Sequence, residues 1–99
     1  MHRGVEVDIS LERGLTNDGF VAEALGNLAA YRLAADRRER LEWQVLRVDT
    51  SGGHHFRLVV RHPERALDVG FAHALGRLLE QLSHEGVGGL PLRTGSAAR

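Results

Sequence analysis

Histidine supplies the most conspicuous candidates for metal binding in this sequence, at His54 and His55. Adjacent residues of a regular β-strand point to opposite faces of a sheet, so these two side chains cannot bind one metal ion unless the chain bends between them. The other potential ligands nearby are Asp49 and His62, and the sequence has neither an HxH or HExxH spacing nor a cysteine. We therefore expect no metal and no other cofactor, with His54 and His55 as polar residues beside a turn and as weak candidates for a metal site.

A hydroxyl group beside a histidine is the minimal arrangement for nucleophilic catalysis, and Ser10 or Thr50 with His55 has the required residue types. The G-x-S-x-G turn that presents a nucleophilic serine is absent. Glu6 and Asp8 point the same way from one strand and could share a proton, but arginines expected on a neighbouring strand favour a salt-bridged surface. The sequence accordingly predicts no catalytic residue and a function other than that of an enzyme.

Two aromatic residues are candidates for contact with a ligand. Trp43 alternates with Leu41 and Val45, which predicts that its indole is buried in the core. Tyr31 falls on the larger apolar stripe of the first expected helix, so its ring is predicted to face the core with the hydroxyl at the edge. The alternative interpretation is a small-ligand or catalytic site between the sheet and the helices, near Trp43 and Tyr31.

Strands that would position these residues are indicated by alternation of apolar and polar side chains. The first strand covers Val5 to Leu11, the second runs from Leu41 to about Asp49, and the third covers His54 to His62. The segment Thr50–Gly53 between the last two predicts a hairpin, because glycine tolerates the positive φ of such turns. A turn at Ser51-Gly52 or one residue later changes the register by two, which leaves the two faces unchanged.

Two helices are indicated by the 3.6-residue period. The first follows the N-cap candidates Thr16, Asn17 and Asp18 and ends near Asp36. Its predicted core face holds Phe20, Ala24, Leu28, Tyr31 and Ala35. A second face of small residues, expected to pack closely against another helix, holds Ala22, Gly26, Ala29, Ala30 and Leu33. The second helix is expected from Arg65 to Ser83, with an apolar stripe of Leu67, Phe71, Ala74, Leu75, Leu78 and Leu82.

The order of elements is β-α-β-β-α, with a candidate short last strand at Leu90-Pro91-Leu92. This order predicts the α/β (α+β) class and a ferredoxin-like sandwich, in which two helices cover one face of an antiparallel sheet and strands 1 and 3 are central neighbours. The open face of strand 1 is acidic and that of strand 3 is basic, and opposite charges on neighbouring strands stabilise a sheet by ~0.2–1 kcal/mol per pair. We expect one domain over residues 1–92 and a flexible C-terminal tail over residues 93–99.

Composition excludes several classes of protein. The 99 residues include 13 basic and 13 acidic side chains, and this zero net charge argues against nucleic-acid binding and polybasic membrane attachment. No apolar run approaches the ~18 residues of a membrane span, and the N-terminus does not have the pattern of a signal peptide. The absence of cysteine is compatible with the cytoplasm, which is the location we expect. All 13 basic residues are arginine, which is typical of GC-rich coding and favours a bacterial source.

The segment Ala74–Leu82, with the sequence Ala-Leu-Gly-Arg-Leu-Leu-Glu-Gln-Leu, resembles the closing helix of ribosome hibernation-promoting factors. This resemblance implies a ribosome- or RNA-associated factor. The chain departs from that family at Pro63-Glu64, which leaves no room for the family's extra strand, and in lacking a basic excess. RNA binding on an open sheet face also needs exposed aromatic rings, whereas Phe56 and Trp43 are predicted to face the helices.

The leading hypothesis is a small protein-interaction or oligomerisation module that forms a homodimer through the open face of its sheet. Apolar side chains interrupt the polar pattern of that face, and a twofold axis could bury them and set acidic strand 1 against basic strand 3 of a second copy. The expected interface residues are Leu46, Val48, Val59, Arg57, Arg61, Glu6 and Asp8. The alternatives are a monomer with intramolecular salt bridges, a dimer through the edge of the second strand, and a different protein as partner.

Overall fold

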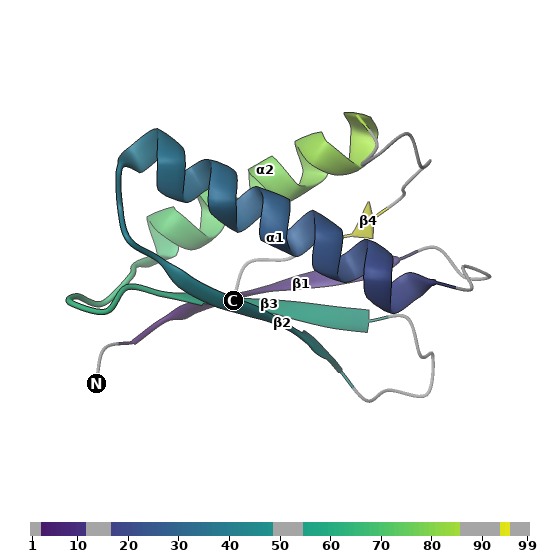
Figure 1. Cartoon of the computed structure of the whole chain (residues 1–99), viewed down its shortest axis with the longest axis horizontal. Coiled ribbons are helices and arrows are strands. Elements are labelled where there is room, and N and C mark those ends of the chain that lie inside the picture. The colour runs from purple at the N-terminus through teal and green to yellow at the C-terminus, as the bar shows by residue number, and fades with distance from the viewer. Residues whose placement is uncertain (1–2, 12–16, 49–54, 86–93, 96–99) are drawn as a thin grey trace.

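A computed structural model describes residues 3–11, 17–48, 55–85 and 94–95 of the chain (Figure 1). Its elements follow the order β1 (Val5–Leu11), α1 (Asp18–Arg37), β2 (Glu42–Arg47), β3 (His55–Arg61), α2 (Val69–Glu85) and β4 (Thr94–Gly95). The sheet has the order β2-β3-β1-β4, and each neighbouring pair is antiparallel. The predicted α+β class, with two helices and an antiparallel sheet, is therefore confirmed, as is the central pairing of the first and third strands.

Strand register decides which side chains share a face of the sheet. Val7 lies opposite Leu58 in the β1–β3 pair, and Glu42 lies opposite Arg61 in the β2–β3 pair. The second pairing is the register expected for a turn centred on Ser51-Gly52, although residues 49–54 lie outside the described part of the chain. The predicted alternation is confirmed on the helix-facing side, where the buried strand residues are Val5, Val7, Ile9, Leu11, Phe56, Leu58 and Val60.

Both helices lie above the sheet in the view of Figure 1, with α1 in front of α2. Helix α1 packs on β2 and, to the same extent, on α2, and α2 also packs on β1. The core between the layers is dense, because Ile9, Leu25, Leu58 and Leu75 are all fully buried. The opposite face of the sheet carries the strand side chains that alternate with the helix-facing ones, and these are half-buried or exposed.

Helix α1 buries a different face from the one that its larger apolar residues predicted. Phe20 and Tyr31 are 69% and 66% exposed, so the prediction that Tyr31 faces the core is wrong. The buried face is instead the one rich in small residues, namely Val21, Ala22, Leu25, Gly26, Ala29, Ala30 and Leu33. A Cβ atom on Gly26 would lie 2.6 Å from Cγ2 of Val45, so the helix backbone approaches β2 so closely that a larger residue would require one of the two to shift. Near Gly26 the small face therefore packs on the sheet, where a second helix was expected.

Helix α2 begins four residues later than predicted, at Val69 in place of Arg65. The carboxylate of Asp68 accepts a hydrogen bond from the backbone N–H of Phe71 at 2.9 Å, which is the geometry of an N-cap residue and fixes the start of the helix. The predicted apolar stripe is buried at Leu67, Phe71, Leu75 and Leu82, together with Leu79.

The predicted last strand at Leu90-Pro91-Leu92 lies outside the described residues. The short strand that the structure places next to β1 is Thr94–Gly95, which pairs with Leu11 and Ser10. These two residues fall within the range that was expected to be a tail. Neither described helix is long and apolar enough to cross a membrane.

Candidate functional site

The candidate site is the face of the sheet opposite the helices, called the open face below. It carries the alternate side chains of β1, β2 and β3, which the register arranges in rows across the three strands. One row holds Leu46, Arg57 and Asp8, and the next holds Gln44, Val59 and Glu6. The seven predicted interface residues are thus neighbours on one surface.

Two ion pairs cross the strands of the open face. Arg57 Nε lies 3.1 Å from Asp8 Oδ1, and Arg61 Nε lies 3.0 Å from Glu42 Oε1. The Asp8–Arg57 pair confirms that acidic strand 1 faces basic strand 3, whereas Arg61 pairs with β2. These side chains are between 19% and 56% exposed, so each pair contributes only ~0–1 kcal/mol to stability.

Apolar side chains lie beside the ion pairs. Leu46 is 42% exposed, and Val59 on the neighbouring strand is half-buried at the diagonal position. Val48 continues the cluster along the chain and is also half-buried. Isolated exposed apolar residues are common on proteins, so the relevant feature is that Leu46 has two apolar neighbours, Val59 diagonally across on β3 and Val48 two residues along the chain.

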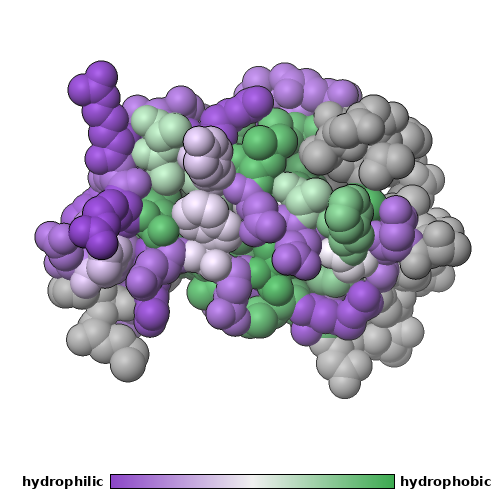
Figure 2. Space-filling view, viewed as in Figure 1, coloured by the Kyte–Doolittle hydropathy of each residue, from purple (hydrophilic) through white to green (hydrophobic). Residues whose placement is uncertain are grey.

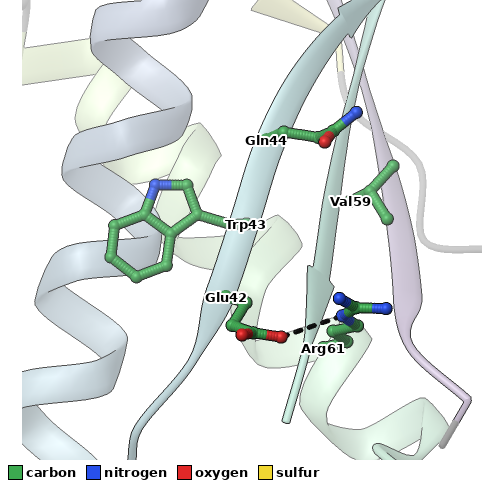
Figure 3. Close-up of a pocket in the computed structure, with 5 residues that line it drawn as sticks. All are labelled: Glu42, Trp43, Gln44, Val59 and Arg61. Carbon is green, nitrogen blue, oxygen red and sulfur yellow. Dashed lines mark hydrogen bonds and ion pairs between the residues drawn. The ribbon is translucent and has the colours of Figure 1, made fainter. Parts of the chain in front are cut away.

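A shallow hollow of about 310 Å³ lies beside this cluster, lined by Glu42, Trp43, Gln44, Val59 and Arg61. Figure 3 shows that Gln44, Val59 and Arg61 project from one side of β2 and β3, whereas the indole of Trp43 projects from the other side toward α1. The hollow is open to solvent and has no second wall. It therefore suits contact with another surface better than enclosure of a small molecule.

The two residues of the alternative site, Trp43 and Tyr31, lie in different surroundings. The Trp43 indole packs against the core, and its Nε1–H donates a hydrogen bond to Asn27 Oδ1 at 3.0 Å. Trp43 is half-buried, which is less burial than its alternation with Leu41 and Val45 predicted. Tyr31, on the outer face of α1, does not contribute to a site between the layers.

Two of the residues that were considered for catalysis, Ser10 and His55, are neighbours in the structure. Ser10 Oγ and His55 Nδ1 lie 2.8 Å apart on exposed surface where β1 meets β3. Thr50 and His54 lie outside the described residues, so the structure does not place them. Among the residues that are described, no three histidine or carboxylate side chains converge as a metal site would require.

One surface that the sequence did not indicate runs along α1 and β2. Arg47 at the end of β2 pairs with Asp18 of α1 at 3.0 Å and lies over the ring of Phe56, 4.7 Å from its centroid. The hydrogen bond to Asp18 raises the pKa of Arg47 above its ordinary value. Figure 2 shows green and pale side chains over α1 and the strand below it, among purple ones. Phe20 and Tyr31 are exposed on this helix. They were not predicted as surface residues, because the apolar periodicity had assigned them to the core.

No protein-family model, curated protein or solved structure matches the chain. The resemblance of Ala74–Leu82 to one helix of ribosome hibernation-promoting factors is therefore not accompanied by a family match. Of the side chains that the structure describes on the open face, none is Phe, Tyr or Trp, the residue types on which single-strand RNA binders stack bases.

Proposed function

We propose that this chain is a small cytoplasmic protein-interaction or oligomerisation module without catalytic activity, and that it forms a homodimer through its open face. The observation that carries the proposal is the apolar cluster of Leu46, Val48 and Val59 beside two ion pairs on the open face. A protein partner is the usual means of removing such a cluster from water.

Charge arrangement supports a second copy as the partner. The Asp8–Arg57 pair is a dipole that points across the sheet from β1 to β3. A twofold axis parallel to the strands and between these two strands would place the same dipole, reversed, on the facing sheet. Each Asp8 would then approach Arg57 of the partner subunit. Because an isologous interface makes every such contact twice, the two ion pairs would form a group of four alternating charges.

We further propose that the fold is a ferredoxin-like sandwich. Support comes from the order β-α-β-β-α-β, from the central antiparallel pair of β1 and β3, and from burial of one face of the sheet. In this architecture no described element covers the open face, which leaves it accessible to a partner.

The experiment is light scattering coupled to size exclusion on the wild type and on Val59→Arg and Leu46→Glu at tens of micromolar. Each substitution places a charge in the apolar cluster, so both should lower the measured mass. Val69→Glu is the matched control, because Val69 is 63% exposed at the start of α2 and outside the open face. Circular dichroism establishes that each variant is folded. A monomeric wild type would overturn the proposal, and an oligomer that neither substitution affects would move the interface off the open face.

A further inference from the structure

The outward side of helix α1 differs from that of α2 in the same molecule. On α2 the exposed side chains beyond the first turn are all polar or charged, namely His73, Arg77, Glu80, Gln81, His84 and Glu85. On α1 two aromatic side chains are exposed, Phe20 by 69% and Tyr31 by 66%. A surface helix normally carries polar residues opposite its buried face, so large apolar side chains on both sides of α1 indicate that a second surface covers it.

The two aromatic residues belong to one row along α1. Phe20, Ala24, Asn27 and Tyr31 are separated by four, three and four residues, which places them on one side of the helix. We call these four residues the outer row, and Figure 2 shows pale and green side chains among purple ones over α1. At about 1.5 Å per residue, the row is roughly 16 Å long. This spacing is the one with which a helix packs along another helix.

The sizes of the side chains in the outer row fit a second copy of the same row. We propose that α1 packs antiparallel against α1 of a second copy, about a twofold axis perpendicular to the helix and midway between Ala24 and Asn27. Phe20 then lies at the height of Tyr31 of the partner subunit, and this contact occurs twice. The small Ala24 beside the axis lets the two backbones approach, and the aromatic pairs pack at the two ends. Antiparallel helices also place opposite ends of their dipoles side by side.

The polar side chains beside the axis are complementary as well. Asn27 Oδ1 accepts the indole N–H of Trp43 at 3.0 Å, which leaves the two N–H donors of the amide for other acceptors. The twofold axis keeps Glu23 and Asn27 on the same side of the contact in both copies, so Glu23 of the partner subunit lies beside this amide. A hydrogen bond from an amide to a carboxylate is charge-assisted. The outer row is thus complementary to itself in size and in hydrogen bonding, which is the reason for a second copy as occupant.

The area of the outer row determines how strong this contact is. A buried aromatic side chain removes about 150–250 Å² from water, and about two thirds of Phe20 and of Tyr31 is exposed. Covering both adds roughly 200–330 Å² on each subunit, whereas a stable interface buries about 800 Å² on each partner. The helix pair is therefore a weak contact whose population depends on protein concentration.

The outer row and the open face lie on opposite sides of the molecule, so the inference is independent of the open-face dimer. Pairing of two open faces leaves both α1 helices on the outside, where they can pair with further copies. The two twofold axes lie on opposite sides of each subunit and do not meet, so use of both contacts extends an assembly without closing it. Both contacts together predict a mass that rises past the dimer with concentration, whereas the open face alone predicts a fixed dimer.

Light scattering on the full chain tests the helix pair in the Val59→Arg variant, which is expected not to associate through the open face. This variant should still associate between about 10 μM and 1 mM, the range of weak interfaces. Adding Phe20→Glu or Tyr31→Glu should raise the dissociation constant about tenfold or more, because each places a charge in the outer row. Both positions are more than 60% exposed, so the variants are expected to fold, which circular dichroism checks. The matched controls are Tyr31→Phe, which keeps the ring, and Val69→Glu on α2.

A spin label on α1 tests the direction of packing. The chain has no cysteine, so Ala35→Cys in the Val59→Arg variant provides a single attachment point. Ala35 is exposed and lies about 14 Å from the proposed axis along the helix, so the two labels of an antiparallel pair should be roughly 30 Å apart. Parallel helices would hold them at about 10 Å, the distance between packed helix axes.

Each result separates the helix pair from the open-face dimer. A Val59→Arg variant that stays monomeric at the highest concentration would overturn the helix pair and leave the open-face proposal standing. Association that neither Phe20→Glu nor Tyr31→Glu weakens, or labels at the parallel distance, would also overturn it. An oligomer that Phe20→Glu dissociates and Val59→Arg does not affect would support the helix pair and overturn the open-face dimer.

Discussion

Substitution of Gly26 by alanine tests the close approach of α1 to β2. The added Cβ atom would lie 2.6 Å from Val45 Cγ2, where ordinary contact begins at 3.4 Å, so one of the two must move by about 0.8 Å. Leu58 Cδ1 at 3.4 Å and Ile9 Cδ1 at 3.8 Å limit movement on the other sides of the new atom. The Val45 side chain cannot easily rotate away from the new atom, because valine is restricted to few rotamers. Overpacking of this kind costs about 1–3 kcal/mol.

Alanine in the middle of a helix is also more stable than glycine by about 1 kcal/mol, and this gain partly offsets the clash. Gly76 in the middle of α2 separates the two effects, because a Cβ atom there would meet nothing within 4 Å. Gly76→Ala should raise the free energy of unfolding by about 1 kcal/mol through the helix preference alone. Gly26→Ala should lie about 1–3 kcal/mol below Gly76→Ala, which is the overpacking cost.

Urea unfolding followed by circular dichroism measures the difference. With a slope of about 1–3 kcal/mol per molar urea, the two variants should differ in midpoint by several tenths of a molar or more. Val45→Ala removes the clashing methyl group, so Gly26→Ala should become favourable in that background, with a coupling energy of about 1–3 kcal/mol. Equal stabilisation by Gly26→Ala and Gly76→Ala would refute the close approach, and with it the reason for burying the small face of α1.

Two further predictions concern Trp43 and metal ions. Trp43→Ala should destabilise the protein by about 2 kcal/mol, less than the ~3–5 kcal/mol typical of a fully buried aromatic, because Trp43 is half-buried; native fluorescence at the wavelength of free tryptophan would contradict its packing against the core. EDTA should leave the melting temperature unchanged, because no described group of residues forms a metal site; a fall of several degrees that zinc reverses would show that a site exists.

The strands could be predicted well because a period of two allows only two choices of face. Alternation placed Val7 and Leu58 in the core and Asp8 and Arg57 on the open face, as the structure does. The central pairing of β1 and β3 followed from the order of elements, and the Asp8–Arg57 ion pair agrees with the charge pattern. These features depend on local sequence and on a small number of possible topologies.

Helix α1 could not be oriented in the same way, because it has two apolar faces. Side-chain size favoured Phe20 and Tyr31, but the decisive quantity is how closely the helix backbone can approach the sheet, which depends on Gly26 and Val45 together. A sequence does not show which distant strand residue a helix will meet. The start of α2 was missed for a simpler reason, since Asp68 has the residue type of an N-cap and was not considered.

The position of β1 in the sheet has a consequence for synthesis of the chain on the ribosome. Ser10 and its partner His55 are 45 residues apart, so β1 must wait for β3 to leave the exit tunnel before it can pair. At about 5–20 residues per second, this interval lasts on the order of seconds. During that time a strand with one wholly apolar face has no native strand neighbour, so its apolar side chains are open to binding by a chaperone.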